Sequence, residues 1–304
     1  MTVAATEHDQ FVANRFPDLG GTLSVSEFGT FTVADGNSSQ VIDVSGGTLT
    51  GSFDLIDGFE TTDGLVLDLL QGTDPVSLVG EAVTHRGTPG VDDTLTGTSS
   101  DEVFLGLSGD DTISGGGRDI IHGGDGDDVF TDVWASFLVA DPDDPNTFGR
   151  LDGGVGFDLV DLSGDTASFD LRILRGDQLS NLERIDITGD GAATVGLSLD
   201  VDAVLSATGG TNAVTGTDDA LIIDGEPGDT LEAFGDWQDT GTASPLATID
   251  GYTVFRRSAT GAEIYVDTNV SVTVTVCSLW PRSAYVARVD RLNGSVLPVR
   301  SDRL

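Results

Sequence analysis

The sequence contains no lysine, three histidines and a single cysteine, Cys277, so no disulfide can form within its 304 residues. All 14 basic residues are arginines, whereas 51 residues are acidic, 42 of them aspartates, and the formal net charge is -37. A chain this acidic repels nucleic acids and anionic membrane surfaces. We therefore expect cations as partners, and no nucleic acid.

Long apolar runs are also missing, so we expect no membrane span. The first thirty residues contain no apolar stretch typical of a signal peptide, and Glu7, Asp9 and Asp18 replace the usual basic start. These absences predict a soluble protein that is either cytosolic or exported without a cleaved N-terminal signal.

Sequence motifs for catalysis are absent. The chain has no HExxH zinc-protease motif, no GxSxG lipase motif and no Gly-rich loop ending in GK[ST]. We therefore expect a non-enzyme. A secreted enzyme that acts on a polysaccharide stays an alternative, because carboxylate pairs are abundant. A pocket outside the repeats with converging carboxylates and an aromatic platform would favour that alternative.

What the sequence has in excess is aspartate together with 41 glycines, a composition that predicts tight turns joining short strands. Between residues 87 and 131 the chain nearly repeats every nine residues, and a sixth copy follows a gap. The first copy has one residue too many, at about Val91, and the fourth has one too few. The copies are GTPGVDDTLT (87–96), GTSSDEVFL (97–105), GLSGDDTIS (106–114), GGGRDIIH (115–122), GGDGDDVFT (123–131) and GGVGFDLVD (153–161).

Each copy ends in a three-residue segment with an apolar residue at its centre. A three-residue strand cannot bury that side chain alone, but stacked copies form a continuous core in which each buried residue contributes about 1.5–3 kcal/mol. The central residues are Leu95, Phe104, Ile113, Ile121, Phe130 and Val160.

The sixth position of every copy is acidic, and stacking the turns places these carboxylates in columns. Two like charges at about 4 Å repel by about 1 kcal/mol in water and about 4 kcal/mol at an effective dielectric of 20. Calcium suits such a column, because it binds six to eight oxygens in irregular geometry, whereas zinc prefers histidine and cysteine. The sixth-position residues are Asp93, Glu102, Asp111, Asp119, Asp128 and Asp158.

This pattern resembles the calcium-binding repeats-in-toxin (RTX, haemolysin-type) family, whose nonapeptide signature is GGxGxDxUx. GGDGDDVFT and GGVGFDLVD match it at every defined position. The resemblance implies an all-β chain with a parallel β-roll flanked by β-rich segments, Ca²⁺-dependent folding, and secretion by type I machinery. Segments 53–69 and 181–272 are similar to strands that accompany such repeats in adhesins, which implies an extracellular or cell-surface ligand. The metal residues it implies are Asp93, Glu102, Gly106, Gly109, Asp111, Gly115, Gly117, Asp119, Gly123, Gly126, Asp128, Gly153, Gly156 and Asp158.

Successive turns alternate between two edges of such an array, so turns on one edge are two repeats apart. We expect Asp93, Asp111 and Asp128 on one edge, and Glu102 and Asp119 on the other. The best calcium site is predicted between turns 106–111 and 123–128. The interval from 123 to 153 is 30 residues, which predicts roughly one additional coil and leaves the stacking partner of Asp158 open.

Four regions are predicted along the chain: a β-rich N-terminal region (1–86), the repeats (87–162) with an insertion at 132–150, a β-rich module (163–276), and a tail (277–304). The tail has five arginines against two aspartates, and its role stays open. We also expect a short helix at 200–205, a turn rather than a metal site at 225–231, an exposed His122, and packing roles for the three tryptophans.

Overall fold

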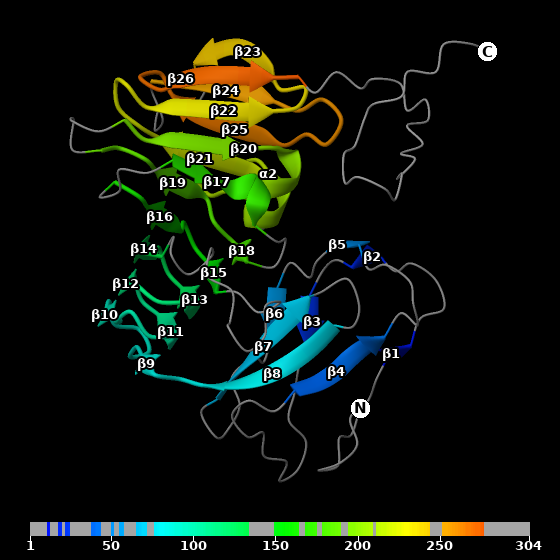
Figure 1. Cartoon of the computed structure of the whole chain (residues 1–304), viewed down its shortest axis with the longest axis vertical. Helices are drawn as coiled ribbons and strands as arrows, with labels where there is room; N and C mark the ends of the chain where they lie inside the picture. The colour runs from blue at the N-terminus through cyan, green and yellow to red at the C-terminus, as the bar shows by residue number, and fades with distance from the viewer. Residues whose placement is uncertain are drawn as a thin grey trace, which may run out of the picture.

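A computed structural model describes residues 80–133, 149–163, 168–174, 178–189, 194–208, 211–240 and 251–276, with Leu65, Val66 and the backbone of further strands. The described chain is mostly β (Figure 1), with one α-helix, α2 (Val201–Ala207), and one 3-10 helix, η1 (Leu171–Ile173). None of its helices has the length and apolar character needed to cross a membrane. The predictions for Cys277, Trp134, Trp280 and the tail lie outside these residues.

The first eight strands precede the repeats. Four of them form a mixed sheet in the order β1-β4-β8-β7, and β8 leads along the chain to the first strand of the repeats. The strands are β1 (Phe11–Val12), β2 (Asp18–Leu19), β3 (Thr22–Ser24), β4 (Ser38–Asp43), β5 (Thr50–Gly51), β6 (Leu55–Asp57), β7 (Leu65–Gln71) and β8 (Val76–Ala82).

From residue 85 to residue 161 the strands alternate between two sheets, and we call one passage through both sheets a coil. The five-stranded sheet contains β9 (His85–Arg86), β11 (Val103–Ser108), β13 (Ile120–Asp125), β15 (Arg150–Val155) and β18 (Leu179–Ser180), all paired in parallel. The nine-stranded sheet begins with β10 (Thr94–Thr96), β12 (Thr112–Ser114), β14 (Val129–Thr131), β16 (Leu159–Asp161), β19 (Arg184–Asp186) and β21 (Ala220–Asp224), also parallel.

The nine-stranded sheet continues through β25 (Glu263–Asp267), β24 (Tyr252–Arg256) and β23 (Gln238–Ala243). β25 pairs with β21 in parallel, whereas β24 pairs with both β25 and β23 antiparallel. A further parallel sheet contains β17 (Ser168–Asp170), β20 (Gly196–Leu199), β22 (Thr230–Phe234) and β26 (Ser271–Thr275). The sheets are therefore both parallel and mixed.

The central apolar residues of the repeats form two rows between the sheets. Leu95, Ile113, Phe130 and Val160 are paired in register across β10, β12, β14 and β16, and Phe104 is paired with Ile121 across β11 and β13. All are buried except Leu95, which is half-buried and packs on the same core. Stacking in register thus gives each short strand the apolar neighbours that it cannot supply itself.

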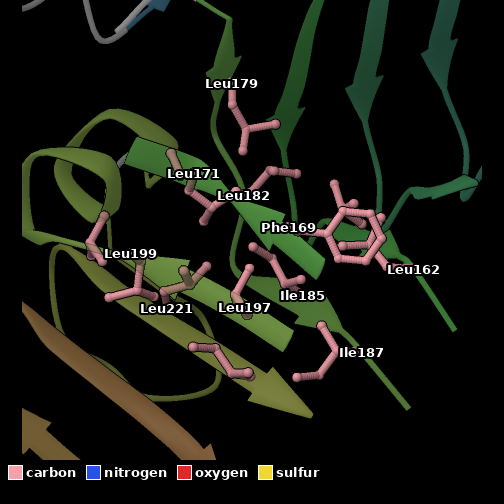
Figure 2. Packing of buried hydrophobic residues seen from close by; sticks show 14 of the residues in the cluster. Leu162, Phe169, Leu171, Leu179, Leu182, Ile185, Ile187, Leu197, Leu199 and Leu221 are labelled. Carbon is pink, nitrogen blue, oxygen red and sulfur yellow. The ribbon is translucent and has the colours of Figure 1, made fainter. Parts of the chain in front are cut away.

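The core is continuous across the predicted boundary at 162/163. One cluster of buried apolar side chains extends from Phe104 to Val270. Figure 2 shows its middle part, which includes Phe169 of β17, Ile185 of β19 and Leu162, the residue that follows β16. The predicted short helix is α2, whose first turn is capped by the Asp200 carboxylate accepting from Ala203 N–H.

The insertion adds no coil of its own, contrary to the prediction from the 30-residue interval. β13 pairs directly with β15, with Ile120 opposite Arg150 and Gly124 opposite Gly154. The inserted segment therefore replaces one turn between β14 and β15, and Arg150 belongs to β15 rather than to the insertion.

His122 is 8% exposed, so the prediction of an exposed ninth position was wrong there. The residue lies on β13 opposite Leu105 of β11, in the row that faces away from the two apolar rows. Leu105 and Val103 form a second apolar cluster with Val66 of β7, so this outer face of the sheet is covered. His122 Nδ1 lies 4.0 Å from Asp152 Oδ2.

Candidate metal centre

Five acidic residues form a column along one edge of the coils, and we call Asp93, Asp111, Asp128, Asp158 and Glu183 column one. Each carboxylate after Asp93 accepts a hydrogen bond from the backbone N–H of the acidic residue one coil earlier. The four N···O distances, from the Asp93–Asp111 pair to the Asp158–Glu183 pair, are 2.7, 2.8, 2.9 and 2.8 Å. The predicted sharing of one edge is thus confirmed, and Asp158 stacks on Asp128.

The preceding residue of each turn makes a second ladder that runs in the opposite direction. Asp92, Asp110 and Asp127 accept from the backbone N–H of Asp110, Asp127 and Phe157, one coil later, at 3.0, 2.9 and 2.9 Å. Paired side chain–backbone bonds therefore hold successive turns in register on both sides of the edge.

The central carboxylates of column one are buried and only partly satisfied. Asp111 is 1% exposed and Asp128 is 0% exposed. One oxygen of each accepts the backbone bond, but Oδ2 of each has no hydrogen-bond donor. A buried carboxylate oxygen without a donor or a cation is costly, because it has lost its water and gained nothing in return.

The pKa values of the column-one carboxylates lead to the same conclusion about their cost. Burial raises the pKa of Asp128 to about 7, and the neighbouring Asp111 carboxylate adds to the shift. Burial also raises the pKa of Asp158 to about 8, with Glu183 and Asp128 contributing, and raises the pKa of Glu183 to about 7. The pKa of Asp111 is raised by burial as well. Without a cation, the ionised column is therefore unfavourable in the folded protein.

Glycines at the first position of each turn leave a small space that oxygens line. A Cβ on Gly106 would lie 2.6 Å from Asp111 Oδ2 and would collide with the carbonyl oxygen of Gly123 in the next coil. A Cβ on Gly123 would likewise meet Asp128 Oδ2 and the carbonyl oxygen of Gly153. Each space combines a carboxylate oxygen with a main-chain carbonyl oxygen, the two donor types that calcium prefers.

The other edge differs, and we call its two acidic residues, Glu102 and Asp119, column two. Asp119 Oδ1 accepts from Glu102 N–H at 3.0 Å, so these residues do stack as predicted. Both carboxylates, however, also accept from backbone groups of their own turns. Glu102 Oε2 accepts from Thr98 N–H at 2.6 Å, and Asp119 Oδ2 accepts from Gly117 N–H at 3.2 Å. The Thr98 bond lowers the pKa of Glu102, as does nearby His85.

The first carboxylate of column one is also satisfied within its turn, because Asp93 Oδ2 accepts from Thr88 N–H at 2.5 Å. The additional residue of the first copy, Val91, is 46% exposed. Of the predicted glycines, Gly109, Gly126 and Gly156 have positive φ and approach the backbone of the neighbouring turn. Gly115 and Gly117 lie in the turn of column two.

Reasoning from the nine-residue pattern missed Glu183, which lies outside the repeats. A signal for it exists, because Glu183 directly precedes β19, whose sequence Arg-Ile-Asp has a buried apolar residue at its centre. Asp158 directly precedes β16 in the same way.

Segment 225–231 contains a turn, as predicted. Asp229 is 0% exposed, and its two carboxylate oxygens accept from Val195 N–H and Glu226 N–H, both at 2.8 Å. Both oxygens are thus satisfied by the backbone, unlike those of Asp111 and Asp128.

The polysaccharide-enzyme alternative requires paired carboxylates and an aromatic platform. A cavity of about 340 Å³ beside α2 is lined by Asp200, Asp202 and Arg172, and no aromatic ring lines it. The Asp200 carboxylate is already used as the helix cap. This cavity does not supply the platform that the alternative requires.

Within the described part of the chain, no group of three or more His, Cys, Asp or Glu side chains is arranged to hold a metal ion. A site in column one would therefore depend on two carboxylates together with main-chain carbonyl oxygens. Comparison with protein-family models, with curated proteins and with solved structures finds no match to this chain.

Proposed function

We propose that this protein binds calcium ions between the stacked turns of column one, and that its two parallel sheets form a calcium-stabilised β-roll. The observation that supports this most is the pair of buried oxygens, Asp111 Oδ2 and Asp128 Oδ2, that have no hydrogen-bond donor. A cation between the turns would give both oxygens a ligand and would offset the repulsion along the column.

The donor set favours a hard cation. Asp111, Asp128 and Asp158 would hold the ions together with first-position carbonyl oxygens such as that of Gly123. Calcium accepts such mixed oxygen sets at irregular angles, whereas magnesium demands a tighter octahedron and retains its waters. The bound ion supplies positive charge that neutralises neighbouring carboxylates.

The proposed sites are not equal. The gap between turns 106–111 and 123–128 and the gap between turns 123–128 and 153–158 each contain an oxygen without a donor. Column two and Asp93 have backbone donors on the corresponding oxygens. We therefore expect the strongest binding in the middle of column one and weaker binding elsewhere.

Calcium binding of this kind would couple to folding. A ligand that binds only the folded state, at a hundred times its dissociation constant, stabilises that state by about 2.7 kcal/mol per site. In low calcium the ionised column would oppose folding, and extracellular calcium would reverse this. The RTX resemblance adds secretion by type I machinery and an adhesin-like or structural role outside the cell; these parts of the proposal depend on the resemblance alone.

The test is a calcium titration of the full chain after removal of divalent ions. We expect isothermal titration calorimetry to detect bound calcium, and circular dichroism to show a gain of β signal over the same concentration range. Magnesium at equal concentration serves as the comparison and is expected to produce a smaller change. A β spectrum indifferent to chelator, with no calcium bound up to about 10 mM, well above the range of extracellular calcium modules, would overturn the proposal.

A further inference from the structure

We propose that Glu183 completes an additional calcium site with Asp158, a site that the nine-residue pattern does not encode. This inference rests on the proposed function, because it extends the same column by one coil. Its support comes from the register of the column, the length of the turn that holds Glu183, and the oxygens around Gly153.

The register places Glu183 as the direct continuation of the column. Glu183 Oε2 accepts from Asp158 N–H at 2.8 Å, just as Asp158 Oδ1 accepts from Asp128 N–H at 2.9 Å. Glu183 is 8% exposed, although it carries a carboxylate. The side chain thus occupies the position of the sixth residue in a repeat turn.

The choice of glutamate follows from a shorter turn. In the repeat turn, Gly153 and Asp158 are five positions apart, whereas in the next coil Asn181 and Glu183 are two apart. Asn181 takes the place of the first-position glycine, since its carbonyl oxygen faces Gly153, and its φ is +52°. The additional methylene of glutamate lets a carboxylate on this shorter turn reach the same column.

The space at Gly153 repeats the one found at Gly106 and Gly123. A Cβ on Gly153 would lie 2.8 Å from Asp158 Oδ2 and would collide with the carbonyl oxygen of Asn181. Asp158 is 1% exposed, and no described residue donates a hydrogen bond to its Oδ2. A carboxylate oxygen of a buried aspartate and a main-chain carbonyl oxygen therefore meet at the gap between these two coils.

Glu183 is also where the column ends. Its backbone carbonyl oxygen accepts from Ile222 N–H at 2.9 Å and from Asn212 Nδ2 at 3.3 Å. Donors from the next coil therefore already use this oxygen. The residue before Ile222 is Leu221, which is fully buried and apolar. The nearest arginine in sequence, Arg184, pairs with Asp224 instead. Among the described residues, no carboxylate follows Glu183 in the column.

The experiment counts calcium ions per chain by native mass spectrometry on the full-length protein, across a calcium titration. We expect Glu183→Gln to bind one ion fewer than the wild type, or to bind its last ion at least tenfold more weakly. Glu183→Asp keeps the charge but loses the methylene, so it should show the same defect. Glu232→Gln, which changes a glutamate on β22 that accepts from Thr275 Oγ1, serves as the matched control and should bind like the wild type.

The outcomes separate this inference from the proposed function. If the wild type binds calcium and Glu183→Gln binds the same number of ions at the same concentrations, this site does not exist but the proposed function stands. If the wild type binds none, the proposed function itself fails. Should Glu183→Gln not fold even in saturating calcium, anomalous scattering from a calcium-grown wild-type crystal decides: an ion between Asp158 and Glu183 supports the site, and a water there overturns it.

Discussion

At the scale of single residues, the carboxylates of column one differ in the donors that surround them. Asp93 has one backbone donor from its own turn, whereas Asp111 and Asp128 each keep one buried oxygen without any. This difference separates side chains that the fold satisfies from side chains that need a partner. It also leads to two substitutions, of which the first should have opposite consequences in the presence and absence of calcium.

The first is Asp128→Asn. The amide removes a buried negative charge, so in calcium-free buffer at pH 8 we expect a higher melting temperature than in the wild type. In calcium the order reverses, because an amide is a poorer ligand than a carboxylate, and affinity should fall at least tenfold. Thermal melts with and without calcium measure both effects.

The matched control is Asp127→Asn, one residue earlier. Asp127 is exposed, and the amide oxygen can still accept from Phe157 N–H. We expect little change in either buffer. If both variants behave alike, the effect arises from net charge and not from the column.

The second substitution is Gly123→Ala. The added Cβ would collide with the carbonyl oxygen of Gly153 and with Asp128 Oδ2, so neighbouring coils would have to separate. Gly90→Ala is the comparison, because Gly90 has φ +73° but open space around it. We expect Gly90→Ala to cost about 1–2 kcal/mol from backbone strain alone. Gly123→Ala should lower the free energy of unfolding by more than that, as measured by urea denaturation in calcium.

At the scale of elements, each short strand depends on the strands beside it. Phe130 of β14 is 0% exposed and lies between Ile113 of β12 and Val160 of β16. Phe130→Ala should therefore cost about 3–5 kcal/mol, measured by urea denaturation in calcium. Val155→Ala, on β15 but 60% exposed, is expected to stay within about 0.5 kcal/mol of the wild type. If Phe130→Ala lowers the free energy of unfolding as little as Val155→Ala does, β14 does not contribute to the core.

The periodic part of these elements could be predicted from the sequence. A nine-residue repeat fixes which residues share an edge, which explains why Asp93, Asp111 and Asp128 were grouped correctly. The pattern could not place Asp158, because a loop of the same length can either replace a turn or add a coil. It also could not find Glu183, because a shorter turn with a longer acidic side chain breaks the spacing while keeping the position in space.

At the scale of the whole molecule, the raised pKa values predict how stability depends on pH. Asp128, Asp158 and Glu183 have folded-state pKa values of about 7 to 8, above their ordinary values. The folded protein then holds more protons than the unfolded chain between about pH 4 and pH 8. In calcium-free buffer, the free energy of unfolding should therefore fall as the pH rises through this range.

Urea denaturation at pH 5 and pH 8 in calcium-free buffer tests this dependence, with Asp128→Asn expected to flatten it. Added calcium should stabilise the protein more at pH 8 than at pH 5, because the ligands are then ionised. A calcium-free protein that is more stable at pH 8 than at pH 5 would contradict the assignment of these carboxylates as unsatisfied.

The 30-residue coil has a consequence for how such a chain can vary. The Asp128–Asp158 bond keeps the same length as its neighbours, although the chain between β14 and β15 includes the inserted segment. The edge with the central carboxylates therefore sets the spacing of the coils, and the opposite edge is free to lengthen. Foreign peptides grafted at residues 140–145 should leave the edge of column one intact, so the opposite edge is the place where this scaffold can acquire new sequence.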